Sequence, residues 1–291
     1  MAVAVCLVMT ACEKAIDVNE QGQQTEVGMP DGTVAKAKKF TFTMKGDFSD
    51  DWKTTRGYLA ADGRDMTDVW VLDYMNGQLA QQLHQGDNTA DDFGKPQMSL
   101  AYGSHHVYFV ASRGTTPTLN VGAHSIVWER PSDTFWKDYE VNVVSTSNGN
   151  RVVTLDRVAT KLRLTFTDFL PADAAVVKVS PHTWYYGLNY QSGEGVADSP
   201  TPLSVNIPSN YIGTTNLVAS FYTISSASPW QTDVTVALMA SDESTIGSIT
   251  ISDVPLQRNH VTSYAGGIVG AGRTLNLGSN DEWVEDDTVN W

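Results

Sequence analysis

Cysteine chemistry is confined to the start of this 291-residue chain, because Cys6 and Cys12 are its only cysteines. Cys6 lies inside an uncharged run, and Cys12 ends that run in the order Met9-Thr10-Ala11-Cys12. Small residues directly before a cysteine are typical of a lipobox, where a signal peptidase cuts and leaves the cysteine as a lipidated N-terminus. The sequence therefore predicts a signal peptide over residues 1–11 and lipidation of Cys12.

The uncharged run before Cys12 is too short for a membrane span, which needs about 20 apolar residues. No Lys or Arg precedes Cys12, whereas a secretory signal normally begins with a basic segment. Two alternatives therefore stay open beside lipidation. The run is either an ordinary signal peptide or an apolar N-terminus that is never processed.

Charge and cysteine content exclude several classes of protein. The chain has 19 Lys and Arg residues against 33 Asp and Glu, which gives a net charge of −14. A nucleic-acid-binding surface needs a basic stripe, so we expect no nucleic acid among the partners. If residues 1–11 are removed, only the lipidated Cys12 remains, and no intramolecular disulfide is possible.

Motifs for catalysis and metal binding are weak. His105 and His106 are neighbours on an expected strand, so their side chains point to opposite faces and cannot bind one metal together. The glycine-rich segment 266–272 lies between two strand patterns, where a bend is more plausible than a phosphate loop. The acidic residues of segment 281–287 do not have EF-hand spacing. We therefore predict no catalytic residues, no cofactor and no metal site.

Aromatic side chains offer one candidate for ligand binding. Trp230 follows Pro229 in a polar loop, and an exposed ring at the edge of a sheet can stack on a sugar. Trp230 is therefore the best candidate for a glycan contact, although large aromatic residues more often fill a core.

The segment between Cys12 and the first expected strand is predicted to be a flexible tether. Residues 12–38 contain few large apolar side chains, so we predict a lipidated flexible arm. A strand-like arm packed on the fold stays open as the alternative. From residue 39 the pattern changes, since Phe40, Phe42 and Met44 alternate with polar residues as in a half-buried strand.

Strand patterns continue to the C-terminal region with little sign of helix. Further apolar runs separated by turn residues cover residues 69–74, 107–112, 125–128, 140–144, 151–155, 161–166, 175–179, 203–207, 217–224, 234–239, 248–254, 260–264 and 273–277. This spacing favours an all-β fold of antiparallel β-sandwiches. The longest polar break lies at residues 145–150, so we predict sandwiches over residues 39–149 and 150–291. No internal repeat is visible at a fixed period.

Four segments resemble the fimbrillin-like family of surface lipoproteins. They are DMTDVWVLDYMNG (65–77), LAYGSHHVYFVAS (100–112), LDRVATKLRL (155–164) and VPLQRNHV (254–261). The resemblance implies two tandem transthyretin-like β-sandwich domains and a lipid anchor in the outer membrane. It also implies a place at the cell surface or in a fimbrium. The partners it implies are other pilus subunits, the outer membrane and a host or bacterial surface receptor.

The resemblance also implies strand exchange, in which an arginine-specific protease removes the first strand and a strand of another subunit replaces it. The matching strand here carries Phe40, Phe42 and Met44. Arg56 is the first candidate for the cleaved residue, and Arg64 is the second. An ordinary surface arginine stays open as the alternative for both.

The C-terminal segment would be a poor donor strand. Trp283, Val289 and Trp291 share one parity, but Glu285 and Asp287 interrupt that face. We therefore predict a non-enzymatic pilus subunit of the tip, anchor or accessory type that supports adhesion. The alternative is a monomeric glycan-binding surface lipoprotein of a nutrient-uptake system. An enzyme with paired carboxylates comes third.

Overall fold

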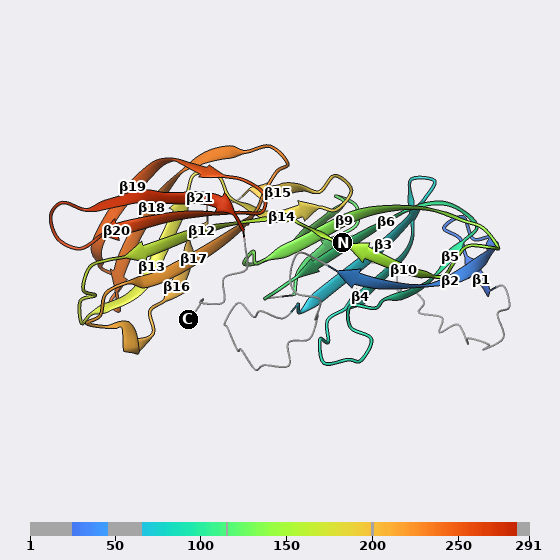
Figure 1. The fold of residues 1–291 in the computed structure, drawn as a ribbon, viewed down its shortest axis with the longest axis horizontal. Helices are drawn as coiled ribbons and strands as arrows, with labels where there is room; N and C mark the ends of the chain where they lie inside the picture. Colours follow the sequence, from blue (N-terminus) through green and yellow to red (C-terminus); the bar gives the residue numbers. More distant parts are fainter. Residues whose placement is uncertain (1–24, 46–65, 115, 199–200, 284–291) are drawn as a thin grey trace, which may run out of the picture.

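The computed structural model describes residues 25–45, 66–114, 116–198 and 201–283, and these form two β-sandwiches placed end to end (Figure 1). Apart from strands they contain one short 3-10 helix, η1 (Ser209–Tyr211). The predicted all-β fold of tandem sandwiches is confirmed. No helix within the described ranges is long and apolar enough to cross a membrane.

The first sandwich packs two sheets around a core that contains Phe42, Val71, Phe109 and Phe135. In one sheet, β2 is the central strand, and its neighbours pair with different parts of it. The strands of that sheet are β1 (Thr25–Gly28), β2 (Val34–Lys45), β5 (Gln97–Ala101) and β10 (Asn150–Thr154). The facing sheet has the order β11 (Asp156–Arg157), β9 (Thr134–Val143), β6 (Gly103–Ser112), β3 (Asp68–Met75) and β4 (Gln78–Gln85).

The second sandwich has its own core, which includes Leu164, Phe166, Trp184 and Val236. Its first sheet has the order β17 (Leu217–Ile224), β12 (Ala159–Phe166), β20 (His260–Gly267) and β21 (Thr274–Glu282). Its second sheet has the order β16 (Leu203–Asn206), β13 (Ala174–Pro181), β18 (Trp230–Ala240) and β19 (Thr245–Leu256). The packing of two sheets face to face around one core is that of a β-sandwich.

A third structural unit, the junction sheet, joins the sandwiches. Its order is β15 (Glu194–Asp198), β14 (Tyr185–Asn189), β8 (Ser125–Val127) and β7 (Thr118–Asn120). Leu188 of β14 lies opposite Ile126 of β8, so backbone pairing connects the two halves of the chain. Leu72, Trp128 and Tyr190 pack together in the core beneath this sheet. The two sandwiches are therefore fused, not linked by a free hinge.

The two sandwiches repeat one topology that the sequence does not reveal. Strands β2, β3, β4, β5, β6, β9 and β10 correspond in order, sheet and direction to β12, β13, β16, β17, β18, β19 and β20. In each sandwich the first strand runs antiparallel to the fourth and parallel to the last of these seven. The sheet that contains β2 and the sheet that contains β12 are therefore mixed, because each includes one parallel pair.

The two ends of the first sandwich differ from the expected boundaries. Residues 25–38, expected to be flexible, form β1 and the start of β2, because Val27 packs in a small cluster with Ala37 and Ala101. This corresponds to the alternative of a packed arm, and residues 12–24 lie outside the described residues. At the other end, β10 and β11 pair with β2 and β9. This pairing favours a boundary near Val158 over the predicted residue 149.

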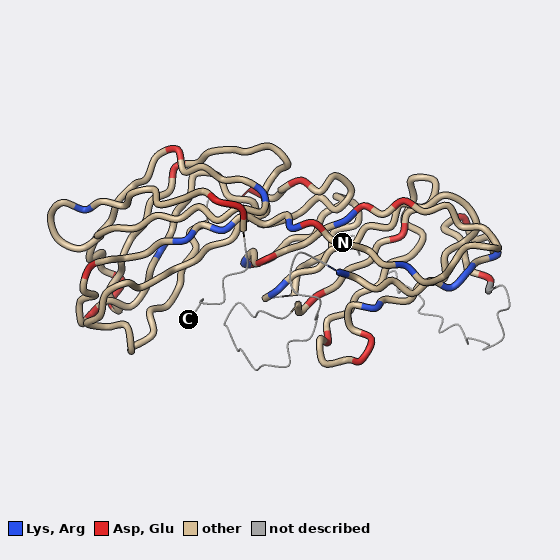
Figure 2. Tube along the Cα trace, viewed as in Figure 1, with Lys and Arg blue, Asp and Glu red and all other residues tan. Residues whose placement is uncertain are grey.

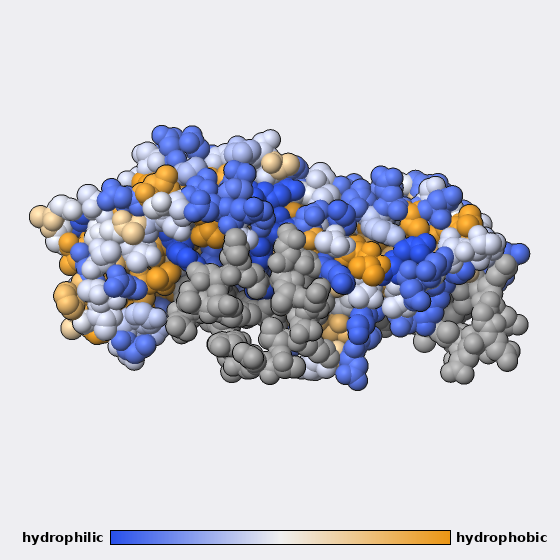
Figure 3. Space-filling model, viewed as in Figure 1, coloured by the Kyte–Doolittle hydropathy of each residue, from blue (hydrophilic) through white to orange (hydrophobic). Residues whose placement is uncertain are grey.

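Charged and hydrophobic residues are both distributed along the molecule in small groups (Figure 2, Figure 3). Acidic and basic residues are interspersed along both sandwiches (Figure 2). Where described residues are visible in Figure 3, hydrophobic residues lie in separate areas between hydrophilic ones. The glycine-rich segment 266–272 contains the end of β20 and its turn into β21, as expected for a bend.

Candidate functional site

Strand β2 places the three predicted exchange residues in the core of the first sandwich. Phe40, Phe42 and Met44 are each 0% exposed. The rings of Phe40 and Phe42 stack with centroids 5.8 Å apart, and Phe42 meets Phe109 edge to face at 5.0 Å. Each such side chain contributes roughly 1.5–3 kcal/mol through burial. The alternation in the sequence therefore identifies a deeply buried strand.

The backbone of β2 is paired along its length by three strands. Strand β1 pairs with residues 34–37, β5 with residues 37–41 and β10 with residues 41–45. The amide N–H of Thr41 donates to the carbonyl oxygen of Gly149 at 2.8 Å, and that of Phe42 donates to the carbonyl oxygen of Pro96 at 3.0 Å. If β2 were withdrawn, hydrogen-bonding groups would be left unpaired on two neighbouring strands, above an apolar floor. These are the properties that strand addition requires.

Gly149 allows β10 to approach β2 closely. A Cβ atom at this position would lie 2.4 Å from the carbonyl oxygen of Lys39. Only a glycine fits such a close backbone approach. The polar turn that suggested a domain boundary therefore also lets the last strand of the first sandwich align with the first.

Three predicted site residues lie outside the described residues, namely Cys12, Arg56 and Arg64. In the sequence, Arg56 and Arg64 fall within residues 46–67, which connect β2 to β3. A cut after either arginine would separate β1 and β2 from the rest of the chain.

Trp230 begins β18 and is half-buried beside the core of the second sandwich. Its indole N–H donates to the Ser225 hydroxyl oxygen at 3.3 Å, and its ring meets that of Tyr185 at 5.4 Å. Much of the ring is therefore used for packing within the chain. Its role as a glycan contact stays a prediction.

The neighbouring histidines His105 and His106 face opposite sides of β6, as expected. His105 is buried, with its Nδ1 atom 2.7 Å from Asp73 Oδ1 and its Nε2 atom 2.8 Å from the Ala101 carbonyl oxygen. A carbonyl oxygen only accepts, so Nε2 carries a proton. Burial lowers the pKa of His105, but the hydrogen bond and charge of Asp73, together with the Ala101 carbonyl, outweigh it and raise the pKa above 6.5.

Arg157 forms a contact between the sandwiches that the sequence does not indicate. Its Nε atom donates to Asp133 Oδ1 at 2.8 Å, in the segment before β9, and Nη1 donates to Asn259 Oδ1 at 3.1 Å, before β20. The guanidinium also lies 4.2 Å from the centre of the Trp283 ring and 4.7 Å from that of Phe135. Hydrogen bonds and cation–π contacts together satisfy this buried charge.

Trp283, which follows β21, is packed against its own chain. It is 8% exposed, and its ring stacks on Tyr222 at 5.7 Å with the Lys161 ammonium 4.9 Å from its centre. Its amide N–H donates to the Asn259 carbonyl oxygen at 2.7 Å. Trp283 is thus engaged within the second sandwich, while Val289 and Trp291 lie outside the described residues. The alternation of residues in the C-terminal segment gives no sign of the contacts of Trp283 with Tyr222 and Lys161.

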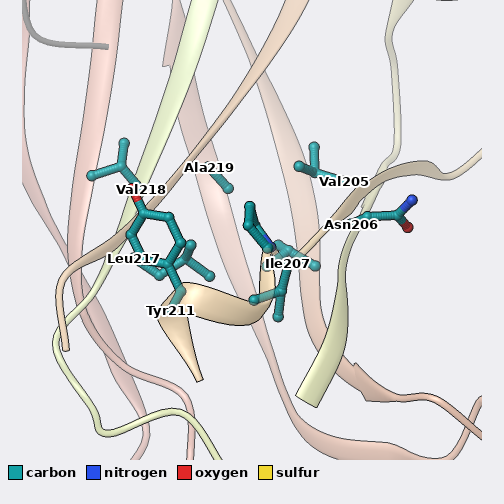
Figure 4. A pocket seen from close by; sticks show the side chains of 9 residues that line it. Val205, Asn206, Ile207, Tyr211, Leu217, Val218 and Ala219 are labelled. Carbon is teal, nitrogen blue, oxygen red and sulfur yellow. The ribbon is translucent and has the colours of Figure 1, made fainter. Parts of the chain in front are cut away.

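A small apolar pocket opens between the sheet edges of the second sandwich, where β16 and β17 meet η1 (Figure 4). Val205, Ile207, Tyr211 and Leu217 are among its lining residues, and no charged side chain lines it. At the corresponding edge of the first sandwich, Phe93 is buried in the core. The pocket thus marks a looser closure of the second sandwich, and Asn206 and Tyr211 are the polar side chains among its lining residues.

Comparisons with known proteins agree on the fold. No protein-family model and no curated protein matches the sequence. A solved Bacteroides thetaiotaomicron protein, provisionally assigned as polysaccharide binding, matches with a TM-score of 0.50 and 13% identity over 85% of this chain and 98% of its own.

Two further solved structures are also similar. A Bacteroides ovatus protein, provisionally assigned as an adhesin, has a TM-score of 0.49 and 12% identity over 83% of this chain and 96% of its own. The tip fimbrial protein of Porphyromonas gingivalis, truncated at its C-terminus, has a TM-score of 0.43 and 11% identity over 84% of this chain and 100% of its own. At such identities a match shows the fold alone. The resemblance to fimbrillin-like proteins is thus confirmed at the level of a shared tandem-sandwich fold.

Proposed function

We propose that this chain is a non-enzymatic subunit of a cell-surface pilus, of the tip, anchor or accessory type. It assembles by β-strand exchange and supports adhesion. Lipid on Cys12 holds it at the outer membrane, and its partners are other pilus subunits and a surface receptor. Structural similarity to proteins described as adhesins and fimbrial proteins supports this class of function.

The arrangement of β2 is the observation that carries the proposal. Its apolar face is fully buried, and its backbone pairs with β5 and β10, which belong to the part of the first sandwich that would remain after a cut. The segment that joins it to β3 carries Arg56 and Arg64. Removal of β2 after a cut would leave a groove that takes a new strand by backbone pairing and by the fit of alternate side chains.

The test uses limited digestion of the lipid-free protein with an arginine-specific protease. Native mass spectrometry follows the loss of residues 1–56 and the uptake of a labelled peptide that spans residues 36–45. We expect the cleaved protein to bind this peptide and to form a ladder with a candidate stalk subunit. A peptide with Ser at positions 40, 42 and 44 should not bind, because the groove would receive no apolar side chains.

The matched control replaces Arg56 and Arg64 by Lys, which keeps the charge but removes both cleavage sites. This variant should keep its N-terminal segment and take up no peptide. The proposal fails if the cleaved wild-type protein keeps its N-terminal segment, or if it loses the segment and still binds no peptide. Peptide uptake is measured directly because a tip or anchor subunit need not polymerise alone.

Glycan binding is the competing proposal, because one solved structure with this fold is provisionally assigned to polysaccharide binding. It predicts a stable monomer that binds polysaccharide and loses that binding when Trp230 is changed to Ala. The packing of Trp230 against Tyr185 weighs against it. Polysaccharide binding without any strand uptake would favour this alternative.

A further inference from the structure

We propose that His106, Asp138 and Glu140 form a binding site for a divalent transition-metal ion such as Zn²⁺. The three residues lie on one face of the β6–β9 pair, the face that continues toward the junction sheet. His106 lies directly opposite Glu140 in the strand register, and Asp138 lies one step along, opposite Tyr108. The site is independent of strand exchange, since β2 contributes nothing to it.

The side-chain atoms of His106 and Asp138 have the spacing of metal ligands, and Glu140 lies close by. His106 Nδ1 is 3.2 Å from Asp138 Oδ1 and 3.3 Å from Oδ2, and one ligand atom of each residue lies within 4.8 Å of the others. Ligands about 2.0–2.2 Å from a tetrahedral Zn²⁺ ion lie roughly 3.3–3.5 Å apart. A small movement of the Glu140 side chain would complete this arrangement, and a long exposed carboxylate can make that movement.

The local charge also favours a cation. Among the described residues, neither Asp138 nor Glu140 forms an ion pair with Lys or Arg. A divalent cation would neutralise the two carboxylates.

The ligand set distinguishes between classes of metal. Imidazole nitrogen with carboxylate oxygen suits Zn²⁺ and its neighbours, whereas Ca²⁺ takes six or more oxygen ligands. Three protein ligands leave a fourth position for water or for a donor atom of a bound molecule. The side chain of His106 is 49% exposed, so that position opens to solvent. The long β6–β9 pair supplies a rigid base for the site.

The test is calorimetric titration of ZnCl₂ into the full-length chain. Cys6 and Cys12 are first replaced by Ser, because free thiolates also bind Zn²⁺. We expect one ion per chain. Asp138→Asn and Glu140→Gln should each weaken binding, and His106→Gln should weaken it at least about tenfold, since even outer-shell changes cost ~10–100-fold. Gln can still donate a hydrogen bond to Asp138, so this variant separates coordination from hydrogen bonding.

His182→Gln is the matched control, because His182 is an exposed histidine of the second sandwich. It should leave the affinity and stoichiometry unchanged. Circular dichroism confirms that each variant is folded. The proposal is overturned if the cysteine-free parent chain binds no Zn²⁺, or if His106→Gln in that chain binds it as tightly as the parent. Either result would mean that His106 and Asp138 form only a hydrogen bond at the surface and that the three residues hold no metal ion.

Discussion

Strands β2 and β12 occupy the same position in two sandwiches of the same topology, but the chain holds them differently. Strand β12 pairs with β17 along all eight of its residues and with β20 along six. Strand β2 is longer, and three strands share its pairing: β1 pairs with four of its residues, and β5 and β10 pair with five each. Because β1 belongs to the segment that a cut after Arg56 or Arg64 would separate, only the pairs with β5 and β10 would hold β2 to the rest of the first sandwich, so this sandwich is the better candidate for the proposed exchange.

The connection that follows β2 and the connection that follows β12 also differ, and this difference again makes β2 the better candidate for exchange. Residues 167–173 lead from β12 to β13, and Asp168 Oδ2 accepts the amide N–H groups of Ile268 and Val269 at 2.5 and 2.8 Å. That contact ties the connection to the turn before β21. Residues 46–67, after β2, are longer and carry Arg56 and Arg64. Equal topology therefore does not mean equal susceptibility to release.

Removal of an aromatic side chain of β2 should have the largest effect. Phe42→Ala should lower the free energy of unfolding by about 3–5 kcal/mol, because it leaves a cavity beside Phe109. Urea unfolding followed by tryptophan fluorescence measures the change. In the second sandwich, Leu164→Ala should cost about 2–5 kcal/mol.

The matched control for this prediction is Thr43→Ala, on the opposite face of the same strand. It should change the free energy by less than ~1 kcal/mol. Equal costs for Phe42→Ala and Thr43→Ala would contradict the placement of the Phe40 to Met44 face in the core. The comparison of the two first strands would then lose its basis.

The contact that joins the sandwiches should be the next most sensitive. Arg157→Met removes the main partner of the buried Asp133 carboxylate, while Arg113 stays 3.6 Å away. We therefore expect a loss of about 2–3 kcal/mol, near the cost of leaving a charged group unsatisfied. Separation of one unfolding transition into two would show that Arg157 also couples the sandwiches.

Lys137→Met is the control for Arg157→Met. Lys137 forms an exposed ion pair with Asp156 at 3.0 Å, and such pairs contribute about 0–1 kcal/mol. If Arg157→Met and Lys137→Met lower the free energy of unfolding by the same amount, the buried contacts of Arg157 contribute no more to stability than an exposed ion pair.

The elements that sequence predicts best are those with a local signal. The alternation at Phe40, Phe42 and Met44 identified the buried face of β2, because a period of two residues is a property of the strand itself. The opposite facing of His105 and His106 followed from the same rule. Most expected strands overlap observed ones for this reason.

The rest depends on partners that are distant in the chain. Arg157 is 126 residues from Trp283, and no short pattern pairs them. The junction sheet uses very short strands such as β7 and β8, whose few residues carry no clear periodicity. The repeat of topology is likewise invisible, because sandwiches need matching faces, not matching residues, to pack. The turn at residues 145–150 suggested a boundary, but β10 returns to β2 after it.

A smaller effect should follow from loosening the connection after β12. Asp168→Asn keeps one oxygen acceptor but loses the charge that strengthens both hydrogen bonds, so we expect a cost of about 1 kcal/mol. Hydrogen exchange should also become faster at Ile268 and Val269. Asp173→Asn, at an exposed position of the same connection, should change neither quantity. Unchanged exchange in Asp168→Asn would show that the two connections do not differ as described.

The smallest expected effect is a pH dependence confined to the first sandwich. The raised pKa of His105 stabilises the fold fully below its unfolded value near 6.5, and that stabilisation is lost as pH rises through the higher folded pKa. Nε2 keeps its proton on the Ala101 carbonyl oxygen, so the proton that is lost is the one between Nδ1 and Asp73, and the loss weakens the contact between β6 and β3 in the first sandwich. Thermal unfolding between pH 6 and 8 should therefore show a downward slope that His105→Gln removes and His106→Gln keeps. Equal slopes in wild type and His105→Gln would contradict this link and leave backbone pairing as the difference between β2 and β12.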